Sequence, residues 1–296
     1  MRAVAELVAE AGPGGSLRLP VQRSQAPLVL RRTADAVYLV SGAAGPLGGD
    51  TLELRIEVRA GATLRLRTVA AAVALPGRYG EESRLTVTAT VGPGARLEYL
   101  PEPTVAADGA RHRTELTVRL AAEATLLLRD EVLLGRHGER GGACRTRLAV
   151  DRDTSRGWRP LLRHELDVSG TDAASFGPAV LAGHRAAGTL LSVEPGEADV
   201  VGRAGGASGA GGSGETGVAR VVDGSSGAGG VVEPWVAVMP LAGPGVLVTA
   251  LAHDTRVLRQ RLDWGLNQLA GRSASSPASI EAGATAVLSG TGGGIA

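Results

Sequence analysis

Apolar and polar side chains alternate with a period of two over most of the chain between residues 15 and 195. In the segment 51–59 apolar residues alternate with charged ones: Leu52, Leu54, Ile56 and Val58 against Glu53, Arg55, Glu57 and Arg59. The alternation recurs at 63–67, 85–91 and 116–120. Successive side chains of a strand point to opposite faces, so each segment predicts a half-buried strand. The pattern predicts an all-β fold built mainly from antiparallel sheets.

Three segments of the chain resemble one another: 58–66, 91–99 and 120–128. Each one reads as a strand, a tight turn and a second strand, with a central alanine at position 62, 95 or 124. The alanines are 33 and 29 residues apart, within the range typical of supersecondary units that stack. We therefore expect layered β-hairpins in a β-helix-like arrangement, without crossover helices. Three unrelated hairpins that share common turn residues are the alternative.

The remaining segments set the domain boundaries. A glycine- and serine-rich stretch at 202–230 contains too few apolar residues to bury itself, so we expect a flexible loop. Residues 255–269 place apolar side chains near one helical face, which predicts one or two helices near the C-terminus. We expect a single β-rich domain over 1–271 and a disordered, low-complexity tail over 272–296.

Composition and charge exclude several function classes. Aromatic residues make up only 2% of the chain, so the core must be aliphatic. Basic and acidic residues number 31 and 30, which provides no electrostatic basis for binding nucleic acid. The single cysteine, Cys144, excludes an intrachain disulfide. No apolar stretch reaches the roughly 18 residues of a membrane helix, so we expect a soluble, cytoplasmic protein with no membrane partner.

A glycine-rich segment at 45–50 precedes the strongest strand pattern. It lacks the Gly-Lys-Ser/Thr of a phosphate-binding loop, so a tight turn is the better interpretation. Asp50 at its end could serve as a cap, as a turn acceptor or as a ligand to a cation. The histidines show neither the H-E-x-x-H pattern nor a Cys/His spacing, so no preformed metal site is predicted: His112, His137, His164, His184 and His253.

No complete catalytic constellation is present in the sequence. The candidate nucleophilic serines fall in the glycine-rich region 207–226, outside a strand-turn-helix setting. Acidic residues at 130–131, at 139 and at 151–153 could approach one another, but their separation is not fixed by the sequence. A solvated face is the simpler interpretation, and we expect no enzymatic activity. A β-helical hydrolase acting on a polysaccharide or an ester remains the enzymatic alternative.

Four segments, in order along the chain, carry a family resemblance: 45–54 (GPLGGDTLEL), 61–72 (GATLRLRTVAAA), 97–103 (LEYLPEP) and 131–139 (EVLLGRHGE). Together they resemble the UreD (UreH) family of urease accessory proteins. The matching motif positions are Gly48, Gly49, Asp50, Thr68, Pro101, Gly135 and Arg136. Weaker similarity continues towards the helical segment.

The resemblance implies a β-helix-like scaffold without catalytic activity of its own. Such a scaffold binds the accessory protein UreF, and through UreF the GTPase UreG, in a complex that docks on apo-urease. It offers an internal passage for Ni²⁺, with no tightly bound cofactor and only transient nickel. Imidazole and carboxylate groups suit this ion, and a conduit must release what it binds. A binding module with no metal role is the further alternative.

The resemblance also names candidate residues for the nickel passage. Asp50 matches the motif carboxylate and is the first candidate. Glu165 lies one position from the family's internal glutamate, so His164 competes with it. A shift of one residue turns a strand side chain to the opposite face, so only one of the two would face the passage. Glu139 is the third candidate, and no stable metal site is expected.

Overall fold

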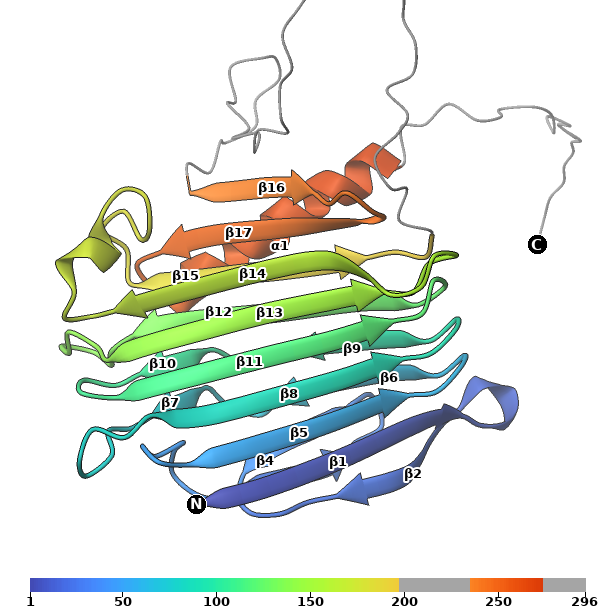
Figure 1. Ribbon diagram of the computed structural model, residues 1–296, viewed down its shortest axis with the longest axis horizontal. Helices are drawn as coiled ribbons and strands as arrows, with labels where there is room; N and C mark the ends of the chain where they lie inside the picture. The colour runs from blue at the N-terminus through green and yellow to red at the C-terminus, as the bar shows by residue number, and fades with distance from the viewer. Residues whose placement is uncertain (197–234, 274–296) are drawn as a thin grey trace, which may run out of the picture.

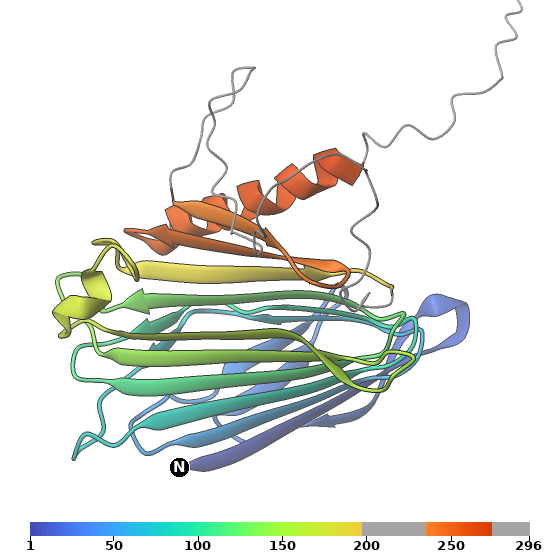
Figure 2. The ribbon, with the colours of Figure 1, turned by 45° about the horizontal axis from the view of Figure 1, so that its top comes forward.

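The computed structural model describes residues 1–196 and 235–273, which form two β-sheets packed face to face with one helix (Figures 1 and 2). The first sheet has seven strands in the order β14-β13-β11-β8-β5-β1-β2. Its strands are β1 (Arg2–Ala11), β2 (Leu17–Arg23), β5 (Thr51–Val58), β8 (Ser83–Val91), β11 (Arg111–Leu120), β13 (Ala143–Arg152) and β14 (Arg159–Ser169).

The second sheet has ten strands, with the main order β16-β17-β15-β12-β9-β6-β4-β3 and with β10 between β12 and β7. These strands are β3 (Leu28–Arg32), β4 (Val37–Ser41), β6 (Thr63–Thr68), β7 (Ala72–Ala74), β9 (Arg96–Leu100), β10 (Thr104–Ala106), β12 (Thr125–Leu134), β15 (Ala186–Val193), β16 (Val236–Pro240) and β17 (Gly245–Ala252). Two short 3-10 helices, η1 (Pro13–Gly15) and η2 (Ala173–Phe176), lie in connections.

The central strands form the stacked coils of a β-solenoid. The chain passes from one sheet to the other through β5 and β6, then β8 and β9, then β11 and β12. The turns that join these pairs contain Ala62, Ala95 and Ala124, all buried. They stack through backbone hydrogen bonds, from Arg96 N to Ala62 O at 2.8 Å and from Thr125 N to Ala95 O at 2.9 Å. The repeat predicted from the three alanines is therefore confirmed as one coil per repeat.

The predicted direction of strand pairing is wrong for these coils. The ladders β5/β8, β8/β11, β6/β9 and β9/β12 are all parallel, and the resembling segments are not hairpins. Alternation fixes the face that a side chain takes, but it does not fix the direction of the neighbouring strand. Antiparallel pairs close the ends of the solenoid, at β1/β2, β3/β4, β13/β14, β12/β15, β15/β17 and β16/β17. The all-β, layered fold class is thus confirmed, with mixed sheets.

The core lies between the two sheets and is aliphatic, as the composition predicts. Inward-facing residues of both sheets form one continuous cluster, in which Leu54, Leu64, Leu97 and Leu126 have at most 1% of their surface exposed. Full burial of such a side chain contributes roughly 1.5–3 kcal/mol. Many equivalent contacts, repeated from coil to coil, therefore stabilise the solenoid.

Helix α1 (Thr255–Ser273) confirms the predicted C-terminal helix and packs on the outer face of the second sheet. The Asp254 carboxylate accepts a hydrogen bond from Val257 N at 2.8 Å and caps the first turn. Leu258 and Leu262 are fully buried against β15 and β17. Gly188 of β15 permits this approach, because an added Cβ would lie 3.0 Å from a Leu262 methyl carbon.

Two predicted segments fall wholly or mainly outside the described residues. The predicted loop at 202–230 lies outside them, and so does the predicted tail from residue 274 onward. The helix continues to Ser273, two residues past the predicted end of the domain. Within residues 1–196 and 235–273, no helix has the length and apolar character needed to cross a membrane.

Candidate functional site

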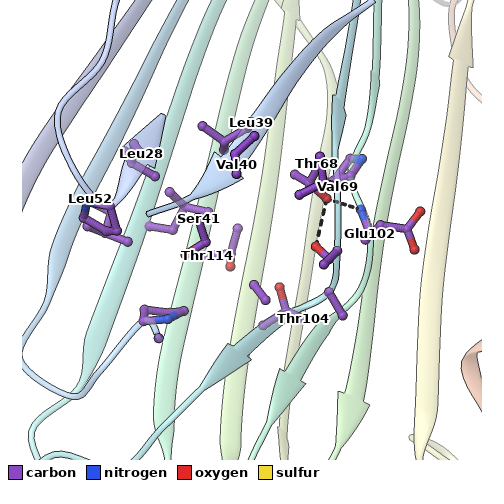
Figure 3. Close-up of a pocket in the computed structure, with 18 of the residues that line it drawn as sticks. Leu28, Leu39, Val40, Ser41, Leu52, Thr68, Val69, Glu102, Thr104 and Thr114 are labelled. Carbon is purple, nitrogen blue, oxygen red and sulfur yellow. Dashed lines mark hydrogen bonds between the residues drawn. The ribbon is translucent and has the colours of Figure 1, made fainter. Parts of the chain in front are cut away.

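A cavity of about 210 Å³ lies between the two sheets, where β6 and β9 end and where β5 and β11 begin (Figure 3). Its mouth is formed by exposed residues, including Ser41 and Val69. Leu28, Leu39 and Leu52 supply much of the apolar wall. A concave and mostly apolar space that also contains a few polar groups is a candidate binding site.

Hydrogen bonds hold the segments of the second sheet that border the cavity. Thr68 ends β6, and its hydroxyl oxygen accepts a hydrogen bond from Glu102 N at 2.8 Å (Figure 3). The same hydroxyl donates to Ala70 O at 3.2 Å. The Pro101 carbonyl accepts a hydrogen bond from an Arg129 guanidinium nitrogen at 3.1 Å. These contacts hold the connections after β6 and β9, whose residues line the cavity.

Asp130 brings a carboxylate into this interior. It follows Leu126 and Leu128 on the inward face of β12 and lines the cavity. Burial raises the pKa of Asp130 to about 6, although a hydrogen bond from the Thr146 hydroxyl lowers it in part. The Asp130 charge in turn adds to the effect of burial in raising the pKa of the Tyr99 hydroxyl. A carboxyl group with a pKa near neutrality can take up and release a cation within the physiological pH range.

His112 faces the same cavity from the first sheet. Its Nδ1 lies 2.8 Å from the Ser83 hydroxyl, and its Nε2 lies 3.1 Å from the Thr114 hydroxyl. Burial lowers the pKa of His112 to about 4, so the ring is neutral at pH 7. A neutral imidazole can bind a transition-metal ion, but only by exchanging one of these hydroxyl contacts for the metal.

The cavity does not form a complete metal site. In the part of the chain that the structure describes, no group of three or more histidine, cysteine, aspartate or glutamate side chains is arranged to hold a metal ion. Cys144 is buried beside this region, and burial together with the Asp130 charge raises the pKa of its thiol. The thiol is therefore a protonated core group at pH 7, and the cavity offers isolated ligands.

Comparison with known proteins decides the family. The sequence model of the UreD urease accessory protein family matches residues 1–283. The chain belongs to the UreD family. A UreD urease accessory protein of Parafrankia sp. (strain EAN1pec) is 43% identical over 284 residues, covering 89% of this chain and 87% of the relative. The UreD protein of Frankia alni is 44% identical over 297 residues, covering 88% and 91%.

A third relative, urease accessory protein UreD 3 of Streptomyces griseus, is 41% identical over 278 residues, covering 91% of this chain and 97% of the relative. The resemblance read from the four motifs is therefore confirmed. UreD proteins are accessory proteins of urease maturation and are not catalytic enzymes. The β-helical hydrolase considered above is accordingly set aside.

The UreD motif around Asp50 forms a tight turn beside the cavity. The Asp50 carboxylate accepts hydrogen bonds from the Met1 amino group at 2.7 Å and from Leu47 N at 2.9 Å. An added Cβ at Gly48 would lie 2.3 Å from Gly77 N, and Gly49 has a φ of 88°. Both glycines are therefore required by the backbone, and both carboxylate oxygens of Asp50 are engaged in holding the turn.

The UreD motif at Gly135 and Arg136 forms a folded corner between β12 and β13. Glu139 accepts hydrogen bonds from Arg136 Nε at 2.8 Å and from Asp108 N at 3.2 Å. The hydrogen bonds from Arg136 lower the pKa of the Glu139 carboxyl to about 2. Gly135 has a φ of 75°, which favours glycine at this bend. Glu139 holds the loop together and does not line the cavity.

The structure shows which of His164 and Glu165 faces the interior. Both lie on the edge strand β14, where the His164 side chain is partly buried on the inward face and Glu165 is exposed. Burial lowers the pKa of His164, whereas Glu165 pairs with Arg145 at 3.6 Å on the outer face. The structure therefore does not bring Asp50, Glu139, His164 and Glu165 together.

The sequence motifs do not identify His112 and Asp130, two of the polar residues that line the cavity. The signal was present, because both occupy inward positions in strands whose other inward residues are mostly apolar. His112 precedes Leu116 and Val118 in the same alternation, and Asp130 follows Leu128. A polar residue at an apolar position of a strand is the feature that identifies them.

Proposed function

We propose that this chain is the non-catalytic scaffold of urease maturation that docks on apo-urease together with UreF and, through UreF, with UreG. On this proposal Ni²⁺ is the cargo, and it moves through the space between the two sheets. The observation that carries the proposal is the cavity lined by Asp130 and His112 inside a mainly aliphatic solenoid. UreD membership supports the role in urease maturation.

The ligand chemistry of the cavity suits transfer better than storage. Imidazole nitrogen and carboxylate oxygen both bind Ni²⁺, and tight sites collect several such ligands around one ion. Here Asp130 and His112 face the cavity from opposite sheets, and both nitrogens of His112 already contact hydroxyl groups. An ion that meets one carboxylate at a time is held weakly, as passage requires. No tightly bound cofactor is part of this proposal.

The proposal assigns different roles to the candidate residues. Asp130 and His112 contact the cargo, and His164, which also faces inward, lies further along the first sheet. Asp50 shapes the turn beside the cavity through its contacts with Leu47 and Met1. Glu139 and Glu165 contribute to the loop and to the outer face, respectively.

The test is nickel-dependent urease activity in cells that carry the urease genes. We compare the wild type, deletion of this chain, Asp130→Asn and the control Asp167→Asn, which removes an exposed carboxylate from the outer face of β14. Protein levels are matched, and the nickel content of purified urease is measured. We expect loss of activity and of nickel in the deletion and in Asp130→Asn, with the control unchanged.

Each outcome decides a separate part of the proposal. Full activity in the deletion strain would overturn the role in maturation. Loss in the deletion, with full activity and nickel content in Asp130→Asn, would overturn the passage and leave a binding module with no metal role. Co-purification with UreF and apo-urease tests the partners separately, because Asp130→Asn changes only an interior group.

A further inference from the structure

The outer face of the second sheet is divided into two parts. Helix α1 covers the part formed by β15 and β17, where Leu190, Val248 and Leu262 form an apolar cluster. The outward positions of β3, β6 and β9 instead include four arginines. Strands β3 and β6 lie on either side of β4, and β9 lies beside β6. We call this set the arginine face: Arg31, Arg65, Arg67 and Arg96.

One carboxylate lies among these guanidinium groups. Glu98 of β9 contacts Arg67 Nη2 at 2.9 Å, Arg96 Nε at 2.9 Å and Arg65 Nε at 3.4 Å. Only 10% of the Glu98 side chain is exposed, whereas 54% of Arg65 and 45% of Arg96 remain exposed. Three cations thus share one anion, and each guanidinium keeps donors that the carboxylate does not use.

The outer face of the first sheet is built differently. Along β1, β2 and β5, four arginines each have a carboxylate close by: Arg18 with Glu10, Arg23 with Glu6, Arg55 with Glu53, and Arg59 with Glu57. These ion pairs balance the charge of the four arginines. The arginine face has four arginines to one glutamate, with Asp35 of the β3–β4 turn near Arg65 at its rim. Arginines therefore outnumber carboxylates on this part of the second sheet.

We propose that the arginine face is a docking surface for a carboxylate-rich segment of a partner protein. Arginine forks match carboxylates in a bidentate geometry, and the guanidinium groups project from neighbouring strands of a rigid sheet. Glu98 shows that this spacing accepts a carboxylate between three arginines. Further glutamate or aspartate side chains would engage the exposed donors, by charge complementarity with the face.

The arginine face adjoins the mouth of the cavity. Arg67 directly precedes Thr68 and Val69, which line the mouth, and Tyr38 of β4 pairs with Arg67 in the register. A partner segment bound across β6 would therefore lie next to the entrance. The docking proposal does not rest on nickel transfer, because it follows from the charge of the surface alone.

The test uses the full-length protein and a fluorescent oligoglutamate peptide, with binding followed by anisotropy at several salt concentrations. The double variant Arg31→Gln/Arg65→Gln removes two charges from the arginine face. Arg18→Gln/Arg23→Gln removes two exposed charges from the first sheet and is the matched control. We expect about fivefold weaker binding and a smaller salt dependence for the first variant, and wild-type binding for the control.

A second variant keeps the test decisive if the arginine substitutions disturb folding, which thermal unfolding would reveal. Glu98→Gln removes the resident carboxylate and frees the surrounding arginines, so oligoglutamate should bind more tightly than to the wild type. Equal weakening in both double variants would overturn the proposal, because binding would then follow net charge. Tighter binding of a single-stranded oligonucleotide than of oligoglutamate at the same salt would also overturn it.

Discussion

Arg259 of helix α1 contacts Glu131 of β12, with its Nη2 atom 2.7 Å from Oε2 of a carboxylate that has no exposed side-chain surface. The same nitrogen lies 3.1 Å from Oε2 of Glu102, which also lines the cavity. Hydrogen bonds to Glu131 and Glu102 raise the pKa of Arg259. One guanidinium therefore joins the helix, the second sheet and the rim of the cavity.

This contact predicts the cost of removing Arg259. Arg259→Ala leaves the buried Glu131 with Arg129 as its remaining cation, at 3.3 Å. Breaking a buried ion pair by deleting one partner costs several kcal/mol, and because Arg259 is partly exposed we expect about 2 kcal/mol of unfolding free energy. Denaturant unfolding measures the loss. Arg256→Ala, at an exposed position of the same helix, should stay within about 0.5 kcal/mol of the wild type.

How much of this structure the sequence predicts depends on the distance between the residues concerned. Alternation in 51–59 identifies the buried face of β5, and the alanines at 62, 95 and 124 identify the coil repeat. Both signals are local. Parallel pairing, in contrast, joins residues that are about one coil apart in the sequence. A tight turn alone does not show whether the next strand pairs with the previous one in the same sheet or enters the opposite sheet.

The cavity is even harder to predict from the sequence, because its residues are far apart along the chain. His112 and Asp130 come from strands of opposite sheets, and the cavity between them is also lined by the segments at Thr68 and Pro101. The motifs identify Asp50 instead. Its carboxylate accepts hydrogen bonds from Leu47 N in its own turn and from the amino group of Met1. A motif indicates that a residue is needed, but only the contacts of that residue show whether it stabilises the fold or lines the cavity.

Asp130 should destabilise the folded protein at neutral pH. Burial raises its pKa to about 6, above the ordinary value of 3.8, so the folded state holds a charge that burial disfavours. Asp130→Asn is therefore expected to stabilise the protein by about 2 kcal/mol at pH 7. The gain should shrink as the pH falls through 6 towards 4, because the wild-type carboxyl is then protonated. Denaturant unfolding at pH 7 and at pH 4.5 tests this.

The same variant separates function from stability. If Asp130 is retained for contact with a cation, Asp130→Asn will be more stable and less able to support urease activation. A variant that is less stable at pH 7 than the wild type would show instead that the carboxylate serves packing and hydrogen bonding with Thr146.

His112 predicts a loss of stability in acid. Burial lowers its pKa to about 4 from the ordinary 6.5, so between these values the unfolded chain binds a proton that the folded protein does not. This contribution is fully present above pH 6.5 and falls by about 2 kcal/mol at pH 5. His112→Gln should lack this part of the pH dependence. Comparing unfolding free energies of the two proteins from pH 7 to pH 5 isolates it, and parallel curves would contradict the assignment.

Gly48 predicts a clash that side-chain motion cannot relieve. An added Cβ would lie 2.3 Å from Gly77 N and 2.5 Å from Glu81 O, both backbone atoms. Gly48→Ala must therefore move one of two connected turns, and we expect a loss of about 3 kcal/mol in unfolding free energy. Gly61→Ala is the matched control, since its Cβ would meet open space at a φ of 69° and should cost only about 1 kcal/mol of backbone strain. Equal losses in the two variants would show that the turn at 45–50 yields easily, and that its glycines are not needed for close packing beside the cavity.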